Sequence, residues 1–161
     1  MLGQPLAEDD KYKVVSFDLG YTDGPAGHDH MVVVTQLCMH HHVLSYHYCL
    51  DTRPCERFTR FLNSPEYMFA TVDTTNDLMV LKSSGLSCEK LVNIQAIIDP
   101  YYRDMKVECK KDKSVWHKAW VKKLDEEHIE YVAKDTYTSY EMYMTIVDMR
   151  KCLLLADDEG Q

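Results

Sequence analysis

Three aspartates and one tyrosine in this sequence have the types and spacing that metal-dependent chemistry requires. Asp18 lies in an extended apolar stretch, residues 14–20, and Asp77 stands at the start of a helical pattern. Tyr131 and Asp135 are four residues apart in a long helical pattern, so they share one helix face. Carboxylates are the hard oxygen ligands that Mg²⁺ demands. The chemistry depends on whether the fold brings the three acids together.

Each of these residues also has an ordinary structural interpretation. Considered alone, Asp77 is more simply a helix cap, Tyr131 a core residue, and Asp135 a surface acid on a helix. Their order and spacing along the chain distinguish a functional set from isolated residues.

The first half of the chain predicts a three-stranded antiparallel meander. Residues 12–19 alternate as a strand does, and residues 21–27 are a loop by their Gly and Pro content. Two apolar stretches, 31–39 and 43–50, flank His40-His41-His42. We interpret these histidines as a hairpin turn and not as a metal site, because neighbouring side chains on strands diverge.

Helices and strands then alternate. We expect a helix opening at residues 51–54 with Phe58, Phe61 and Leu62 facing the core, and a short buried strand over 68–72. Asn76-Asp77 leads into a helix that Gly85 ends. Residues 91–98 are apolar and fit either a strand or a helix, and residues 99–123 resist assignment.

The last helix is the clearest element. Asp125 is the expected N-cap, with Leu124 and Ile129 forming a hydrophobic staple around it. Apolar and small residues then recur at helical spacing for about six turns; they are Ile129, Val132, Ala133, Thr136, Tyr140, Tyr143 and Val147. The pattern predicts an α/β domain with a mixed central sheet flanked by helices. Residues 12–155 form that domain, between a flexible N-terminus (1–11) and an acidic tail (156–161).

Composition narrows the class of protein further. A chain of 161 residues suits one domain, its six cysteines show no metal-binding spacing, and no apolar run is long enough to span a membrane. We expect an intracellular protein, cytoplasmic or nuclear. The net charge of −8 argues against a general nucleic-acid binder. Residues 103–123 are locally +5, however, so Lys110, Lys111 and Lys113 are either a solvated face or a phosphate-binding patch.

Several stretches resemble the DEDD-type 3′–5′ exonucleases of the RNase H-like superfamily, tyrosine subclass. The resemblance is nearest to the Werner-syndrome type, and within it to the plant exoribonuclease members. It runs from about residue 12 to residue 150 and rests on Phe17-Asp18, Gln36-Leu37-Cys38, residues 61–65, Asp77 with Leu81, Trp120, and above all residues 128–137.

The resemblance implies a role for each acidic position in a two-metal mechanism. Asp18 would bridge both ions, Asp135 would bind the ion nearer the nucleophile, Asp77 would support the site, and Tyr131 would position the attacking water. Gly20 stands where the family has a metal-binding glutamate. Residues i and i+2 of a strand share a face, so the first metal loses a ligand. Asp23 and Asp73 remain open as substitutes, although nothing in the sequence places them at metal distance.

The sequence therefore implies a catalytically degenerate 3′–5′ exonuclease-like protein that acts as a nucleic-acid-associated or protein-interaction module. The alternative is a weak exonuclease on single-stranded RNA or DNA that uses Mg²⁺ or Mn²⁺. The resemblance further implies a preference for RNA over DNA. The expected protein partners are a second copy of the chain, active exonuclease relatives or RNA-silencing proteins.

Overall fold

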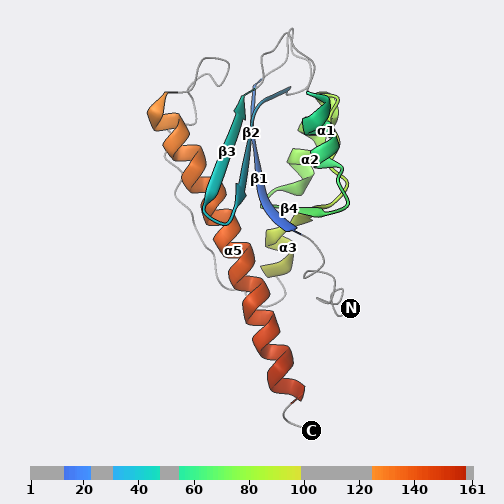
Figure 1. Cartoon of the computed structure of the whole chain (residues 1–161), viewed down its shortest axis with the longest axis vertical. Helices are drawn as coiled ribbons and strands as arrows, with labels where there is room; N and C mark the ends of the chain where they lie inside the picture. The colour runs from blue at the N-terminus through green and yellow to red at the C-terminus, as the bar shows by residue number, and fades with distance from the viewer. Residues whose placement is uncertain (1–12, 23–30, 48–54, 99–124, 159–161) are drawn as a thin grey trace.

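A five-stranded mixed sheet forms the centre of the molecule. The computed structural model describes residues 13–22, 31–47, 55–98 and 125–158, with side chains described up to residue 152. The elements in chain order are β1 (Lys13–Thr22), β2 (Met31–Met39), β3 (His42–His47), α1 (Glu56–Leu62), β4 (Tyr67–Thr71), α2 (Thr74–Ser83), β5 (Leu91–Asn93), α3 (Ile94–Ile98) and α5 (Glu126–Asp158). Figure 1 looks along the sheet, with α5 on one side and α1 and α2 on the other.

The strand order is β3-β2-β1-β4-β5, so β1 is central. β1 pairs antiparallel with β2, and β2 pairs antiparallel with β3. β4 runs parallel to β1, and β5 runs parallel to β4. The predicted α/β class is confirmed, as is the antiparallel meander followed by parallel strands.

Alternate residues of β1 enter two different cores. Val15, Phe17 and Leu19 belong to a cluster with α1 and α2, whereas Val14 packs against a cluster that includes Tyr143 of α5. Successive side chains of a strand point to opposite faces. The even-numbered residues of β1 therefore face α5, and this places Asp18 and Gly20 on the α5 side.

The histidine turn is where the sequence predicts it. His40 and His41 form the turn between β2 and β3, and His40 has a φ of 54°, in the left-handed region. The rings of His40 and Tyr140 lie 6.0 Å apart, and those of His41 and Tyr137 lie 6.4 Å apart. The hairpin tip thus rests near the middle of α5.

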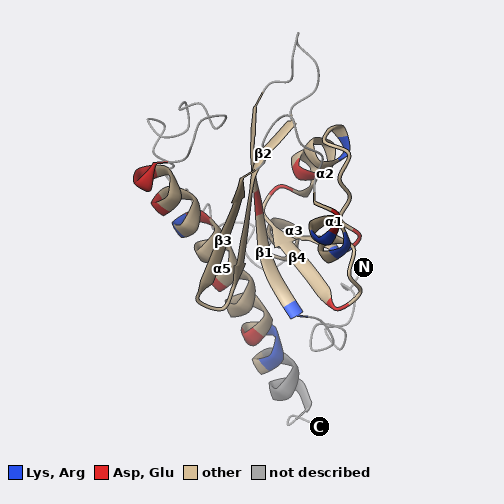
Figure 2. Cartoon of the chain, turned by 45° about the horizontal axis from the view of Figure 1, so that its top comes forward, with Lys and Arg blue, Asp and Glu red and all other residues tan. Residues whose placement is uncertain are grey.

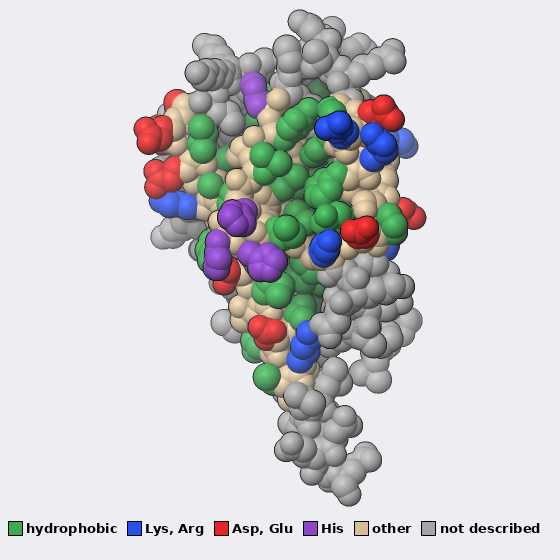
Figure 3. Space-filling model, viewed as in Figure 1, with side chains coloured by type: hydrophobic (Ala, Val, Ile, Leu, Met, Phe, Trp, Pro, Cys, Tyr) green, Lys and Arg blue, Asp and Glu red, His purple; other side chains and the backbone are tan. Residues whose placement is uncertain are grey.

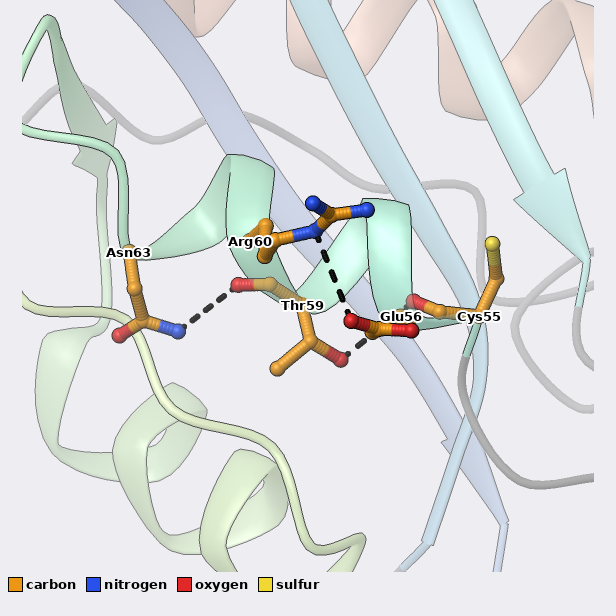
Figure 4. A network of polar contacts seen from close by, with 5 residues as sticks. All are labelled: Cys55, Glu56, Thr59, Arg60 and Asn63. Carbon is orange, nitrogen blue, oxygen red and sulfur yellow. Dashed lines mark hydrogen bonds and ion pairs between the residues drawn. The ribbon is translucent and has the colours of Figure 1, made fainter.

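Local hydrogen bonds fix the ends of α1 and α2. α1 begins at Glu56, and Figure 4 shows Asn63 Nδ2 donating to the Thr59 carbonyl at 2.9 Å where the helix ends. α2 ends as predicted: Gly85 has a φ of 70°, and its N–H donates to the Lys82 carbonyl at 3.1 Å. Leu86 N–H donates to the Leu81 carbonyl at 2.8 Å, which completes a Schellman motif.

The ambiguous segment 91–98 contains both kinds of element, since β5 runs directly into α3. A three-residue strand followed by one helical turn is too short for either periodicity to show. α5 has 33 residues and continues to Asp158, well beyond the six turns expected, so it includes part of the predicted acidic tail.

The core face of α5 begins one residue earlier than the sequence predicts. Ile129 is 48% exposed, whereas His128 is only 7% exposed. The predicted staple is therefore wrong at Ile129, and its other member, Leu124, lies outside the described residues. Asp125 contributes to this difference: it accepts from the His128 N–H at 2.9 Å and contacts the ring Nδ1 at 2.5 Å, and both contacts hold the His128 ring in its buried position.

No helix in the described part of the chain is both long and apolar enough to cross a lipid bilayer.

Candidate functional site

Asp18 occupies the middle of the central strand. It is half-buried and lies in register with Gln36 of β2, on the sheet face that α5 covers. Ser16, two residues earlier on the same face, is fully buried, and Gln36 is 1% exposed. Asp18 therefore has two buried polar residues, Ser16 and Gln36, as neighbours on the sheet.

Asp77 lies in the first turn of α2 and is 4% exposed. Thr71, at the end of β4, donates its hydroxyl to Asp77 Oδ2 at 2.5 Å. The helix cap is Asp73, whose carboxylate accepts from the Asn76 N–H at 3.2 Å. The interpretation of Asp77 as a simple cap is thus wrong, and Asp73 is exposed and engaged as the cap.

Tyr131 and Asp135 are both half-buried on α5. They alternate with Val132 and Thr136, which are 2% and 0% exposed and point more directly at the sheet. Thr136 Oγ1 donates to the Val132 carbonyl at 2.8 Å, so its hydroxyl is satisfied within the helix. α5 packs against β1 and β2, and Asp135 and Asp18 thus belong to elements in direct contact.

Gly20 interrupts this acidic set. It is buried and lies in register with Val34, and the β1–β2 register shifts directly after it. Gly85 is the single described glycine with a positive φ, so the Gly20 backbone is one that any residue can adopt. The backbone conformation at this position therefore does not require glycine.

The side chains that could bind metal ions determine whether this site can hold two of them. Within the described ranges, no group of three or more His, Cys, Asp or Glu side chains is placed to hold a metal ion. A two-metal site needs several carboxylates around ions about 4 Å apart. The described residues therefore do not fit a complete two-ion exonuclease centre, and Asp18 and Asp135 remain as a pair of candidate ligands.

Two buried polar groups beside Asp18 were not predicted as site residues. Ser16 Oγ and Gln36 Oε1 are buried without a hydrogen-bond partner in the structure. Gln36 was part of the sequence resemblance without a role, and Ser16 was not singled out in the sequence. A polar residue at an inward position of an otherwise apolar strand is the one signal that marks both.

Charges around the site are unevenly distributed. Figure 2 shows acidic side chains at the amino-terminal end of α5, where Glu126 and Glu127 lie in the first turn. Negative charge is favourable there because the helix dipole is positive at that end. Lys110, Lys111 and Lys113, the predicted phosphate-binding residues, lie outside the described residues.

The fold of the chain is similar to that of several solved nuclease structures. The Brucella melitensis NrnC structure with bound Mg²⁺ matches with a TM-score of 0.69 and 13% identity, over 86% of this chain and 74% of that one. The Aedes aegypti Nibbler EXO domain matches with a TM-score of 0.66 and 14% identity, over 92% of this chain and 84% of that one. These similarities establish the fold.

Escherichia coli RNase D, an exoribonuclease involved in structured RNA processing, matches with a TM-score of 0.63 and 18% identity. The match covers 92% of this chain and 43% of that one. No protein-family model matches the sequence, and the search of curated proteins likewise found no match.

Proposed function

We propose that this chain is a catalytically degenerate 3′–5′ exonuclease-like protein that binds single-stranded nucleic acid. The observation that carries the proposal is Gly20. Gly20 lies two residues after Asp18 on the same face of the central strand. A carboxylate at this position would complete the ion site, and glycine does not supply one. The absence of this ligand weakens binding of a divalent ion. Without the ion, the charge of the remaining carboxylates is not compensated.

The binding part of the proposal comes from the fold and from the basic segment. One similar structure is NrnC bound to pGG, with a TM-score of 0.67 and 13% identity over 89% of this chain and 76% of that one. In this chain the net positive segment is 103–123, so Lys110, Lys111 and Lys113 are the proposed phosphate contacts. We propose RNA over DNA as the preferred strand. The proposed protein partners are a second copy of the chain, active exonuclease relatives or silencing proteins.

A binding assay tests this directly. Fluorescence anisotropy with a labelled 12-nucleotide RNA and the matching DNA, in EDTA and at several salt concentrations, should show salt-dependent binding. Triple replacement of Lys110, Lys111 and Lys113 by Glu should weaken binding and flatten the salt dependence. Unchanged affinity in that variant would refute the assignment of this patch, and no binding by the wild type would favour a protein-interaction module.

An activity assay tests degeneracy separately. Wild-type protein should leave the same oligonucleotides intact in Mg²⁺ or Mn²⁺. Gly20→Glu returns a carboxylate beside Asp18, so it should tighten Mn²⁺ binding measured by calorimetry, and Asp18→Asn in that background should remove the gain. The contradicting outcome is shortening of the oligonucleotides by wild-type protein that Asp18→Asn abolishes.

That outcome would establish the second candidate function, a weak 3′–5′ exonuclease that needs Mg²⁺ or Mn²⁺. The observation in its favour is that Asp18 lies on β1, and that α2, with Asp77, and α5, with Tyr131 and Asp135, each pack against β1. In that case Asp18 and Asp135 would hold the ion, Asp77 would support the site and Tyr131 would orient the water.

A further inference from the structure

Two buried oxygen atoms beside Asp18 have no role in the proposed function. Ser16 Oγ and Gln36 Oε1 are buried and form no hydrogen bond in the structure. The two residues are 0% and 1% exposed, so folding has removed both side chains from bulk water. Buried polar atoms in native proteins are almost always paired with a protein group, an ordered water molecule or an ion. The two oxygens therefore indicate a bound species next to Asp18.

The three oxygen-bearing side chains lie on one face of the sheet. Asp18 and Gln36 are directly opposite each other in the antiparallel β1–β2 pair, and opposite residues have Cβ atoms about 5 Å apart. Ser16 precedes Asp18 by two residues, so it lies about 7 Å further along the same face. The Asp18 and Gln36 side chains can therefore both reach an ion held about 2.0–2.6 Å from each oxygen.

The types of oxygen favour a cation over a neutral molecule. Gln36 Oε1 can only accept, so its partner must be a hydrogen-bond donor or a positive ion. The half-buried Asp18 adds a negative charge on the same face. A carboxylate has about four lone-pair positions, so contacts that Asp18 makes elsewhere do not use all of them. Carboxylate and carbonyl oxygens together suit Mg²⁺, Mn²⁺ and Ca²⁺.

We propose that Gln36 Oε1 and the Asp18 carboxylate together bind a single hard divalent cation, with Ser16 Oγ as the third oxygen of the site. The Gln36 amide then supplies one of the contacts that a carboxylate at position 20 would make. This inference rests on the proposed function, which takes Asp18 as an ion-binding residue. Neutral oxygens do not replace the missing charge, so the site binds its ion weakly. It also holds one ion, where two-metal hydrolysis uses two.

Exposed histidines are competing ligands within the described part of the chain. Figure 3 shows histidine side chains gathered on one face of the molecule, and His40, His41 and His42 are exposed. Imidazole suits Zn²⁺, Cu²⁺ and Ni²⁺, whereas carboxylate and carbonyl oxygens suit Mn²⁺ and Mg²⁺. Mn²⁺ is therefore the probe that favours the Asp18 site over the histidine turn.

Titration of Mn²⁺ into the full chain without nucleic acid, followed by calorimetry and by EPR of the free ion, tests the proposal. The wild type should bind one Mn²⁺ with a Kd of about 0.1–1 mM, as weak sites of this kind do. Asp18→Asn should abolish the binding. Gln36→Met keeps the length of the side chain but removes the oxygen, so it should weaken binding at least about tenfold. Gln36→Glu should tighten binding, because a carboxylate replaces the amide.

Two matched variants control for indirect effects. Thr136→Val removes a buried hydroxyl that already donates to the Val132 carbonyl, so it should bind Mn²⁺ as the wild type does. The double variant His41→Ala/His42→Ala removes two exposed histidines and should also leave the affinity unchanged. Circular dichroism checks the fold of every variant. If Gln36→Met does not fold, the comparison of Gln36→Glu with the wild type decides the role of Gln36.

Equal Mn²⁺ affinities in the wild type, Gln36→Met and Gln36→Glu would overturn the proposal and would assign a water molecule to Gln36 Oε1. So would binding that Asp18→Asn preserves, binding that the double histidine variant abolishes, or no binding at millimolar Mn²⁺. These outcomes are separate from those of the proposed function, because the titration contains no nucleic acid and the RNA-binding assay contains EDTA.

Discussion

The two faces of the central sheet differ in what they hold. The face toward α1 and α2 is apolar and aromatic: Phe17 and Phe69 meet edge to face at 6.0 Å, and Phe61 and Phe69 do so at 5.3 Å. The face toward α5 divides along its length. Tyr143, Ile146 and Val147 pack on an apolar half, while the other half carries buried polar groups.

The comparison shows that alternate residues of β1 have two different roles. On β1 the odd positions, Val15 to Leu19, stabilise the core, and the even positions, Ser16 to Gly20, line the candidate site. Mutations at adjacent residues should therefore have very different consequences.

Phe17→Ala and Asp18→Asn compare the two faces at neighbouring positions. Phe17 is 1% exposed and its loss leaves a cavity, so we expect about 3–5 kcal/mol of lost stability. Asp18→Asn keeps the shape of a half-buried side chain and should cost about 0.5–1.5 kcal/mol. Urea denaturation monitored by circular dichroism measures both. Equal losses would mean that the even face is as structural as the odd one.

Thr71→Val tests the buried hydrogen bond to Asp77. Removing the hydroxyl leaves a 4%-exposed carboxylate without one donor, so we expect a loss of about 1–3 kcal/mol. Thr138→Val on the exposed face of α5 is the control and should change stability by less than about 0.5 kcal/mol. If both variants unfold at the same urea concentration, Thr71 does not stabilise Asp77.

Asp125→Ala tests how the polar end of α5 is held. The variant loses the N-cap and the contact with the His128 ring, so we expect about 1–2 kcal/mol of destabilisation. Glu126→Ala, also in the first turn, loses the favourable interaction with the helix dipole and should cost about 0.3–1 kcal/mol. A thermal melt in which Glu126→Ala is the less stable variant would contradict this role for Asp125.

The reactivity of the native cysteines compares buried and exposed positions without any mutation. Burial raises the pKa of Cys88, in the apolar face, to about 12, so its thiol stays protonated at pH 8. Burial, with a smaller contribution from Glu141, also raises the pKa of Cys38. The amides of Phe58 and Arg57 lower the pKa of exposed Cys55, which favours its thiolate.

Iodoacetamide at pH 8 should therefore modify Cys55 at least about tenfold faster than Cys88, because the thiolate is the reactive form. Peptide mass spectrometry after timed quenching measures each site. Comparable rates at Cys55 and Cys88 would show that the apolar face opens readily.

Local patterns were enough to predict most elements. The hairpin around His40 and His41, the helix end at Gly85 and the N-cap at Asp125 depend on backbone and side-chain preferences within a few residues. Short elements could not be predicted. In residues 91–98, a strand of three residues is followed directly by a helix of five, and neither is long enough to show its periodicity. The prediction that Ile129 faces the core was wrong. Helical spacing of apolar residues gives no information on the contact between the neighbouring His128 and Asp125.

The sequence by itself determined which residues share a face. Asp18 and Gly20 share a strand face because side chains alternate, and Tyr131 and Asp135 share a helix side because 3.6 residues make a turn. The tertiary structure alone decided that α5 covers the even face of β1. It also decided that Thr71 donates to a buried Asp77 and that Gln36 lies beside Asp18. These relations join residues far apart in the chain, and only packing of the helices on the sheet brings such residues together.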